Sequence, residues 1–195
     1  MLNKLFSRIK DKWSYEFNKQ FKPELIGGYH TSDGRILTKT RISNTTHISN
    51  RSKLIIGDNV FIGHFNYIDS NQGVTIEEGC QVTNYISILT HSSHDSIRLY
   101  GNKYLEKFTE LQGMRLGPVY IGKYTYVGAH SLIMPGTKIG KGCIISAYSY
   151  VDGQYPDYSI LRGIPAQIIG LTKDRDMKLL KEFPDLKSCY FEKDI

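Results

Sequence analysis

Residues 119–151 read VYIGKYTYVGAHSLIMPGTKIGKGCIISAYSYV, and an aliphatic residue returns at every sixth position of this stretch. These positions are Ile121, Val127, Ile133, Ile139, Ile145 and Val151. A period of six is neither the 3.6-residue period of a helix nor the alternation of a long strand. It predicts very short strands joined by turns, three to a coil, with the aliphatic side chains pointing into a triangular solenoid.

The same spacing organises the preceding part of the chain. Three earlier sets occur, each beginning eight residues after the last member of the set before it: Ile36, Ile42 and Ile48; Ile56, Ile62 and Ile68; Ile76, Val82 and Ile88. Together the fifteen inward positions predict about five coils. The next residue is often a glycine, as at Gly57, Gly63, Gly122, Gly128 and Gly140. We expect these glycines at corners where the chain bends tightly.

Two flanking segments complete the predicted organisation. Residues 1–35 form an N-terminal helix and lead-in, 36–170 the solenoid, and 171–195 a C-terminal helical tail with a helix over 172–183. The first helix carries apolar residues at helical spacing (Leu2, Leu5, Phe6, Ile9, Trp13 and Phe17) and basic residues (Lys4, Arg8, Lys10 and Lys12). We favour the interpretation that this helix packs on the solenoid or on a neighbouring subunit. Its apolar and basic residues would also suit binding to an anionic membrane surface.

Composition narrows the function classes. The chain has 195 residues, with 25 basic and 19 acidic side chains scattered along it. The net charge of +6 suits anionic ligands, but without a basic cluster it does not point to nucleic acid. Three cysteines argue against a disulfide scaffold and for a reducing compartment. Neither a signal peptide nor an apolar run of about 20 residues is evident, so we expect a cytoplasmic protein.

One segment breaks the period for about 30 residues. Residues 89–118 read LTHSSHDSIRLYGNKYLEKFTELQGMRLGP, and long loops in compact folds are usually functional. His91 and His94 lie where this loop leaves the coil, and Asp95 follows at once. A histidine with a carboxylate near it suits general-base catalysis, because the carboxylate fixes the tautomer and stabilises the imidazolium.

A second pair of polar residues precedes the loop by about 20 residues. His64 and Asn66 belong to the sequence GHFNY, one coil earlier. We expect them to stack on the wall near the start of the loop and, with Asp95, to contact the substrate.

These residues together resemble the hexapeptide-repeat acyltransferases over roughly residues 36–170. The resemblance rests on the repeat, on THSSHD at 90–95 and on the ending YSILRGIPAQIIG at 158–170. It implies a left-handed parallel β-helix and is closest to sugar O-acetyltransferases of surface-polysaccharide clusters. It further implies a homotrimer with active sites between subunits, in which a histidine deprotonates the acceptor and acetyl-CoA donates the acyl group directly.

The resemblance also assigns residues to the acyl donor. The family's cofactor turns map to Gly128, Ala129, Ser146 and Ala147, and its closing turn maps to Gly163, Pro165 and Ala166. This chain departs from the family pattern at Tyr148, Ile164 and Gln167. Arg162 is then expected to supply the basic charge near the nucleotide end.

The resemblance leaves two histidines as candidates for the base. Many relatives place the base five residues after an inward aliphatic residue. Counting from Ile88, that position is Ser93, so His94 is one residue late and His91 two early. We favour His94 as base, with His91 orienting it or binding the acceptor.

Several alternatives stay open. The acceptor is a small-molecule or lipid-linked sugar, and an amino sugar would make the reaction an N-acetylation. Gamma-type carbonic anhydrases share the fold, and there His64, His91 and His94 would be zinc ligands. Their spacing does not match that family, so no metal is expected. A scaffold without catalytic activity is the remaining alternative.

Overall fold

The computed structural model describes residues 9–10, 12–13, 22–107 and 111–192. Of the residues predicted for the N-terminal helix, only Ile9, Lys10, Lys12 and Trp13 fall in these ranges, and all four are exposed. The other apolar and basic positions of that helix lie outside the described residues. Within the described part of the chain, no helix has the length and apolarity that crossing a membrane requires.

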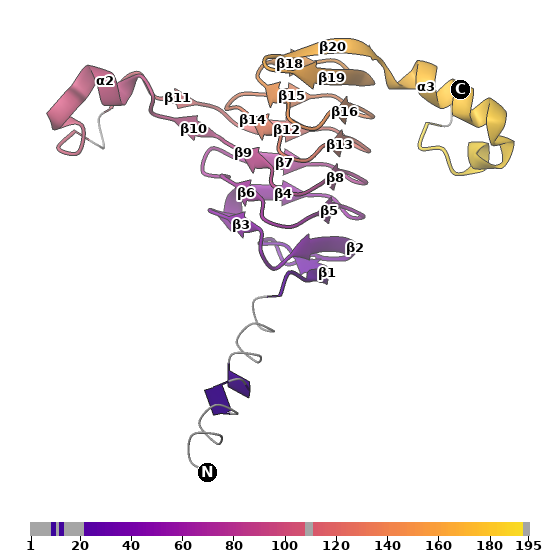
Figure 1. Cartoon of the computed structure of the whole chain (residues 1–195), viewed down its shortest axis with the longest axis horizontal. Coiled ribbons are helices and arrows are strands. Elements are labelled where there is room, and N and C mark those ends of the chain that lie inside the picture. The colour runs from indigo at the N-terminus through magenta and orange to yellow at the C-terminus, as the bar shows by residue number, and fades with distance from the viewer. Residues whose placement is uncertain (1–8, 11, 14–21, 108–110, 193–195) are drawn as a thin grey trace.

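The main body is a parallel β-solenoid with three sheets (Figure 1). Sheet 1 has the order β1 (Leu25–His30), β2 (Ile36–Ser43), β5 (Phe61–Ile62), β8 (Gln81–Val82), β13 (Tyr126–Val127), β16 (Ile144–Ile145), β19 (Ser159–Gly163) and β20 (Ala166–Leu171). Sheet 2 contains β3 (His47–Ile48), β6 (Tyr67–Ile68), β9 (Ser87–Ile88), β14 (Leu132–Ile133) and β17 (Tyr150–Val151). Sheet 3 contains β4 (Leu54–Ile56), β7 (Val74–Ile76), β12 (Val119–Ile121), β15 (Lys138–Ile139) and β18 (Gln154–Tyr155).

The chain visits sheets 1, 2 and 3 in turn, so each coil has three corners. We call the corner between sheets 1 and 2 the first corner, and the corner between sheets 2 and 3 the second. Five complete coils are followed by β19, the first strand of a sixth. The register stacks equivalent residues, as with Ile68 on Ile88 and Ile88 on Ile133. The triangular solenoid predicted from the six-residue period is therefore confirmed.

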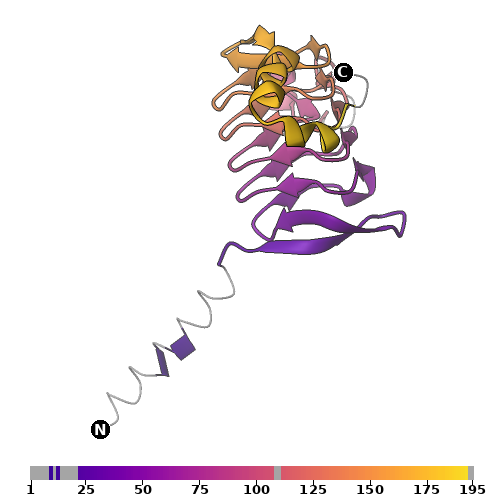
Figure 2. The same ribbon diagram turned by 90° about the vertical axis from the view of Figure 1, so that its right-hand side faces the viewer.

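The aliphatic residues of the repeat form the core. Thirteen of the fifteen predicted inward positions are buried, and Ile48 packs against the same cluster. Ile36 was predicted wrongly, because its side chain is 58% exposed and the neighbouring Leu37 is buried. At this point β2 pairs antiparallel with β1, and it joins the solenoid only at Arg41 and Ile42. Figure 2 shows this β1–β2 hairpin at the lower end of the stack.

Glycine is required at these positions of the repeat for a reason other than the expected tight bend. A Cβ on Gly122 would lie 2.6 Å from the backbone nitrogen of Lys141, and one on Gly128 would lie 2.5 Å from that of Ala147. Close approach of the next coil, and not a positive φ, therefore excludes a side chain here. Residues with positive φ come two positions later, as at His130.

Two segments project from the upper solenoid on opposite sides (Figure 1). The first is the arm, which we define as residues 89–118; it leaves after β9 and returns to β12. Its base is the antiparallel pair β10 (His91–Ser92) and β11 (Arg115–Leu116), and it carries α2 (Ser96–Tyr100) and η2 (Gly101–Lys103). The second contains α3 (Thr172–Glu182) and η3 (Pro184–Ser188). A short η1 (Arg51–Lys53) precedes β4.

Candidate active site

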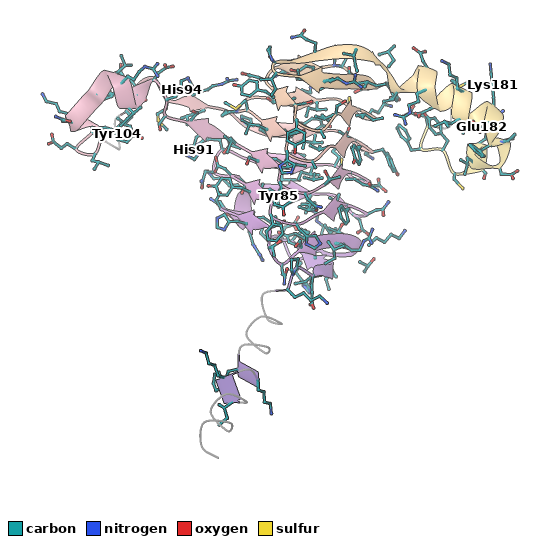
Figure 3. The ribbon with its side chains drawn as sticks, in the orientation of Figure 1. Tyr85, His91, His94, Tyr104, Lys181 and Glu182 are labelled. Atoms are coloured by element: carbon teal, nitrogen blue, oxygen red, sulfur yellow. The ribbon has the colours of Figure 1, made fainter. Side chains whose placement is uncertain are left out.

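A histidine–aspartate pair lies at the second corner, where the arm leaves the solenoid. The Nδ1 atom of His91 is 2.5 Å from Oδ2 of Asp69. The Asp69 side chain is fully buried, while that of His91 is 43% exposed. The histidine therefore presents part of its ring to solvent while a buried carboxylate holds its inner nitrogen. Figure 3 shows His91 and His94 at the root of the arm.

The surroundings of Asp69 keep it ionised. Burial by itself raises the pKa of this carboxyl group. Hydrogen bonds from the backbone and side chain of Thr90, the backbone of Asn71 and the ring of His91 outweigh that effect and hold the pKa well below its usual range. The Thr90 amide and hydroxyl donate to Oδ2 over 3.0 and 2.8 Å. An ionised Asp69 only accepts hydrogen bonds, so Nδ1 of His91 carries a proton, and in the neutral ring the lone pair is then on Nε2.

His94 has a different environment. Its Nδ1 lies 2.8 Å from the Ser92 hydroxyl, and its Nε2 lies 3.3 Å from Oδ2 of Asp95. Asp95 also pairs with Arg98 one turn along α2. Both ring nitrogens of His94 thus have partners within the arm, and its orienting carboxylate is itself half-exposed and shared.

The other two residues expected near the loop lie elsewhere. His64 is at the first corner, where its Nδ1 is 2.7 Å from the Ser43 hydroxyl. Asn66 is buried, and its side chain bonds the backbone of Gly63, Thr83 and Ile86. Asn66 therefore holds neighbouring coils together at the first corner. Sheet 2 separates both residues from the root of the arm.

Asp69 was missed by the sequence analysis, although the sequence contained a signal for it. The 20-residue repeat stacks Ile68 under Ile88, so Asp69 lies under the residues that start the arm. It is an acidic residue one position after an inward isoleucine. The coil above has Leu89 at the equivalent position. An acidic residue where the next coil has a leucine is therefore the sequence signal that pointed to Asp69.

The residues assigned to the acyl donor gather at the first corner. Val127 stacks on Ile145, and Ile145 stacks on Leu161, so the turns after these residues lie one above another. The stacked turns contain Gly128 and Ala129, then Ser146 and Ala147, then Arg162 and Gly163, with Pro165 and Ala166 in the β19–β20 turn. Arg162 is exposed and Ala166 is buried.

The bulky Tyr148 is accommodated in the same corner by an aromatic column. Tyr148 has a φ of 58°, and its ring stacks on His130 with centroids 4.8 Å apart. His130 stacks in turn on Tyr85, and Tyr85 on Phe65. All four residues have positive φ. The side chain that replaces a family glycine therefore extends a column that the coils below already form.

The two groups of candidate residues occupy different corners. The first corner precedes the strands of sheet 2, and the second corner follows them. Six residues at about 3.3 Å each make one side of a coil, so up to about 20 Å separates His91 from the turns that the sequence assigned to the donor within one chain. Among the described residues, no three His, Cys, Asp or Glu side chains form a group that could hold a metal ion.

The six-residue repeats on either side of the arm match two known family models. Residues 118–153 match the family described as bacterial transferase hexapeptide (six repeats), and residues 53–88 match the hexapeptide repeat of succinyl-transferase.

Two curated relatives each match more than half of this chain. A Mycobacterium tuberculosis protein named "Probable acetyltransferase Rv3034c" is 28% identical over 68% of this chain and 44% of its own length. An Escherichia coli K12 protein named "Putative lipopolysaccharide biosynthesis O-acetyl transferase WbbJ" is 28% identical over 61% of each chain. The chain thus spans about half the length of these relatives.

Solved structures share the fold. A galactoside acetyltransferase in complex with coenzyme A superposes with a TM-score of 0.59 and 24% identity, over 68% of this chain and 62% of that one. AntD of Bacillus cereus, an N-acyltransferase with dTDP and 3-hydroxybutyryl-CoA, has a TM-score of 0.57 and 20% identity over 75% of this chain and 87% of its own. The predicted left-handed β-helix is confirmed, and so is the predicted resemblance to the hexapeptide-repeat acyltransferases.

Proposed function

We propose that this chain transfers an acetyl group from acetyl-CoA to a sugar hydroxyl, with His91 as general base and Asp69 as the carboxylate that orients it. The pairing of His91 with the buried, ionised Asp69 carries this proposal. It assigns the base to His91 and not to His94, because the two nitrogens of His94 have partners within the arm.

The proposed reaction is direct. Nε2 of His91 takes the proton of the acceptor hydroxyl while the hydroxyl oxygen attacks the thioester carbon of acetyl-CoA. The negative charge of Asp69 stabilises the imidazolium that forms. The tetrahedral intermediate collapses, the C–S bond breaks, and the imidazolium returns the proton to the leaving coenzyme A thiolate. No covalent enzyme intermediate is needed, and burial raises the pKa of Cys80 to about 12, which makes that thiol a poor nucleophile.

The donor would lie along the first corner. Gly128, Ala129, Ser146 and Ala147 would line the pantetheine arm, and Gly163, Pro165 and Ala166 the nucleotide end. The exposed Arg162 guanidinium is suited to the phosphates of coenzyme A. The crystal complex of galactoside acetyltransferase with coenzyme A supports this class of donor.

A second copy of the chain would complete the site. One chain holds base and donor turns at different corners, so the acyl group reaches His91 most simply when a neighbour presents its first corner to the second corner of this chain. A homotrimer closes this head-to-tail contact with three equivalent sites. We therefore propose a homotrimer.

The acceptor is proposed as a small-molecule or lipid-linked sugar. The name of the E. coli relative supports O-acetylation in polysaccharide synthesis, whereas AntD is an N-acyltransferase, so an amino sugar is the second candidate.

The described cysteines are free, and Cys189 is exposed, which fits the proposed cytoplasmic location. A zinc site is disfavoured, because His64, His91 and His94 each have a separate hydrogen-bond partner within the chain.

Thiol release from acetyl-CoA tests the proposal against a panel of nucleotide sugars and free sugars. The assay uses a Cys189→Ser background, because that exposed thiol would react with the reagent. Acceptor-dependent release that falls at least 100-fold in His91→Ala and little in His94→Ala supports it. The converse pattern moves the base to His94. If coenzyme A does not bind in calorimetry, the transferase proposal fails.

A further inference from the structure

Two carboxylates occupy equivalent positions at the second corner, below and above the arm. Asp69 follows Ile68, and Asp152 follows Val151, so each comes directly after the inward residue of a sheet 2 strand. The stacking of β6, β9, β14 and β17 puts them in one column. The arm leaves after β9, which lies between them. Asp69 contacts the first strand of the arm, β10, through His91.

Asp152 binds the other strand of the arm. Nη1 of Arg115 is 2.7 Å from Oδ2 of Asp152, and Nη2 contacts Oδ1, so the pair is bidentate. Nη2 also donates to the carbonyl oxygen of Pro135 over 3.0 Å. Both side chains are partly buried, at 37% and 27% exposed. Charge-assisted bidentate pairs of this kind fix geometry as well as supplying energy.

The backbone around Arg115 adds to this anchor. Ser92 pairs with Arg115, and His91 pairs with Leu116, so a shift of β11 moves β10 with it. The Gly117 amide donates to the Thr90 carbonyl over 3.1 Å. A Cβ on Gly117 would lie 2.8 Å from the Gly136 backbone, so the arm returns in close contact with the corner above.

We propose that Arg115 and Asp152 are positioning residues that clamp the arm and so hold His91 against Asp69. The inference rests on the proposed function for its catalytic consequence. The β10–β11 ladder has two residues on each strand, and so short a hairpin is marginal without other contacts. The guanidinium–carboxylate pair supplies those contacts. Displacement of a catalytic group by about 1 Å can cost about 100-fold in rate.

The test compares Asp152→Asn and Arg115→Lys with wild type, using the full chain. The lysine keeps the charge and loses the bidentate geometry. We expect hydrogen exchange in peptides covering 89–92 and 114–118 to quicken about tenfold, with the exchange of β12 to β18 unchanged. Diethyl pyrocarbonate should modify His91 at least threefold faster. Where an acceptor is found, kcat should fall about 10–100-fold with an unchanged KM for acetyl-CoA.

The matched control is Asp33→Asn, which removes the exposed Asp33–Arg35 bridge of 2.9 Å from the β1–β2 turn. It should alter none of these readouts. Unchanged exchange at the arm root in Asp152→Asn would overturn the proposal, and so would faster exchange throughout the solenoid, which would indicate a general structural role. Exchange and histidine modification need no acceptor, so they decide the clamp even if the chain proves not to bind coenzyme A.

Discussion

Replacing Asp69 by asparagine tests the proposed catalytic pair most directly. Oδ2 of Asp69 accepts hydrogen bonds from the Thr90 amide, the Thr90 hydroxyl and His91 Nδ1. Oδ1 accepts hydrogen bonds from the Ser49 hydroxyl, the Asn71 amide and the Asn71 side chain. An asparagine must direct its NH₂ group at one of these sets of donors. Either orientation leaves buried donors facing each other and removes the charge that His91 binds.

The size of the effect follows from these contacts. A hydrogen bond to a charged group contributes about 1.5–3 kcal/mol, and an unsatisfied buried donor costs about 1–3 kcal/mol. We expect Asp69→Asn to lower the free energy of unfolding by about 3–5 kcal/mol. Because the tautomer of His91 is no longer fixed, kcat should fall by about 10²–10⁴. Thermal melting and single-turnover thiol release measure the two effects separately, at a temperature where the variant is folded.

Coenzyme A binding serves as the control, because Asp69 is not among the residues proposed to hold the donor. Its affinity should stay within about threefold of wild type. A kcat within threefold of wild type, measured on folded Asp69→Asn, would refute the assignment of the catalytic pair.

The remaining predictions concern both corners and the pH dependence of stability. His91→Ala should lose at least 100-fold in kcat and His94→Ala less than fivefold in thiol release; equal losses would mean that both act on the acceptor. Gly128→Ala should lower the free energy of unfolding by about 1–3 kcal/mol, because its Cβ meets the backbone of the next coil, whereas Gly27→Ala, which has nothing within 4 Å, should be neutral in thermal melting. The folded pKa of Asp69 is depressed, so its contribution to stability is present above about pH 4 and is lost as pH falls below that value. Wild type should therefore destabilise more steeply than Asp69→Asn in chemical denaturation between about pH 4 and pH 2, and parallel curves would contradict this.

The solenoid could be predicted from the sequence because its signal is repeated. Each coil contacts only its neighbouring coils, and inward residues such as Ile121 and Ile133 form one continuous core, so position in the repeat determines position in space. Ile36 fits the period but lies in a hairpin, since the end of a solenoid has no coil below it to impose the register. A repeat pattern is therefore least informative at its ends.

The site was less predictable, because it depends on which corners the residues occupy. The separation of 20 residues between His64 and the loop suggested proximity, but His64 comes at the first corner and the arm leaves from the second. Asp69 lies 22 residues before His91 and is its partner. The number of residues from the loop places both His64 and Asp69 in the coil below it. Only their positions within the six-residue repeat show that they lie at different corners.

The same column of the second corner shows how a uniform scaffold gains a specific site. Leu89 and Met134 lie between Asp69 and Asp152 in this column, and Ser49 lies below Asp69. A charge here costs no core packing, because the preceding isoleucine or valine already fills the interior. Each carboxylate instead binds one strand of the arm, His91 below and Arg115 above. The arm and the two aspartates thus act together. The repeat supplies a rigid frame, and the two carboxylates fix the position of the arm's histidine on that frame.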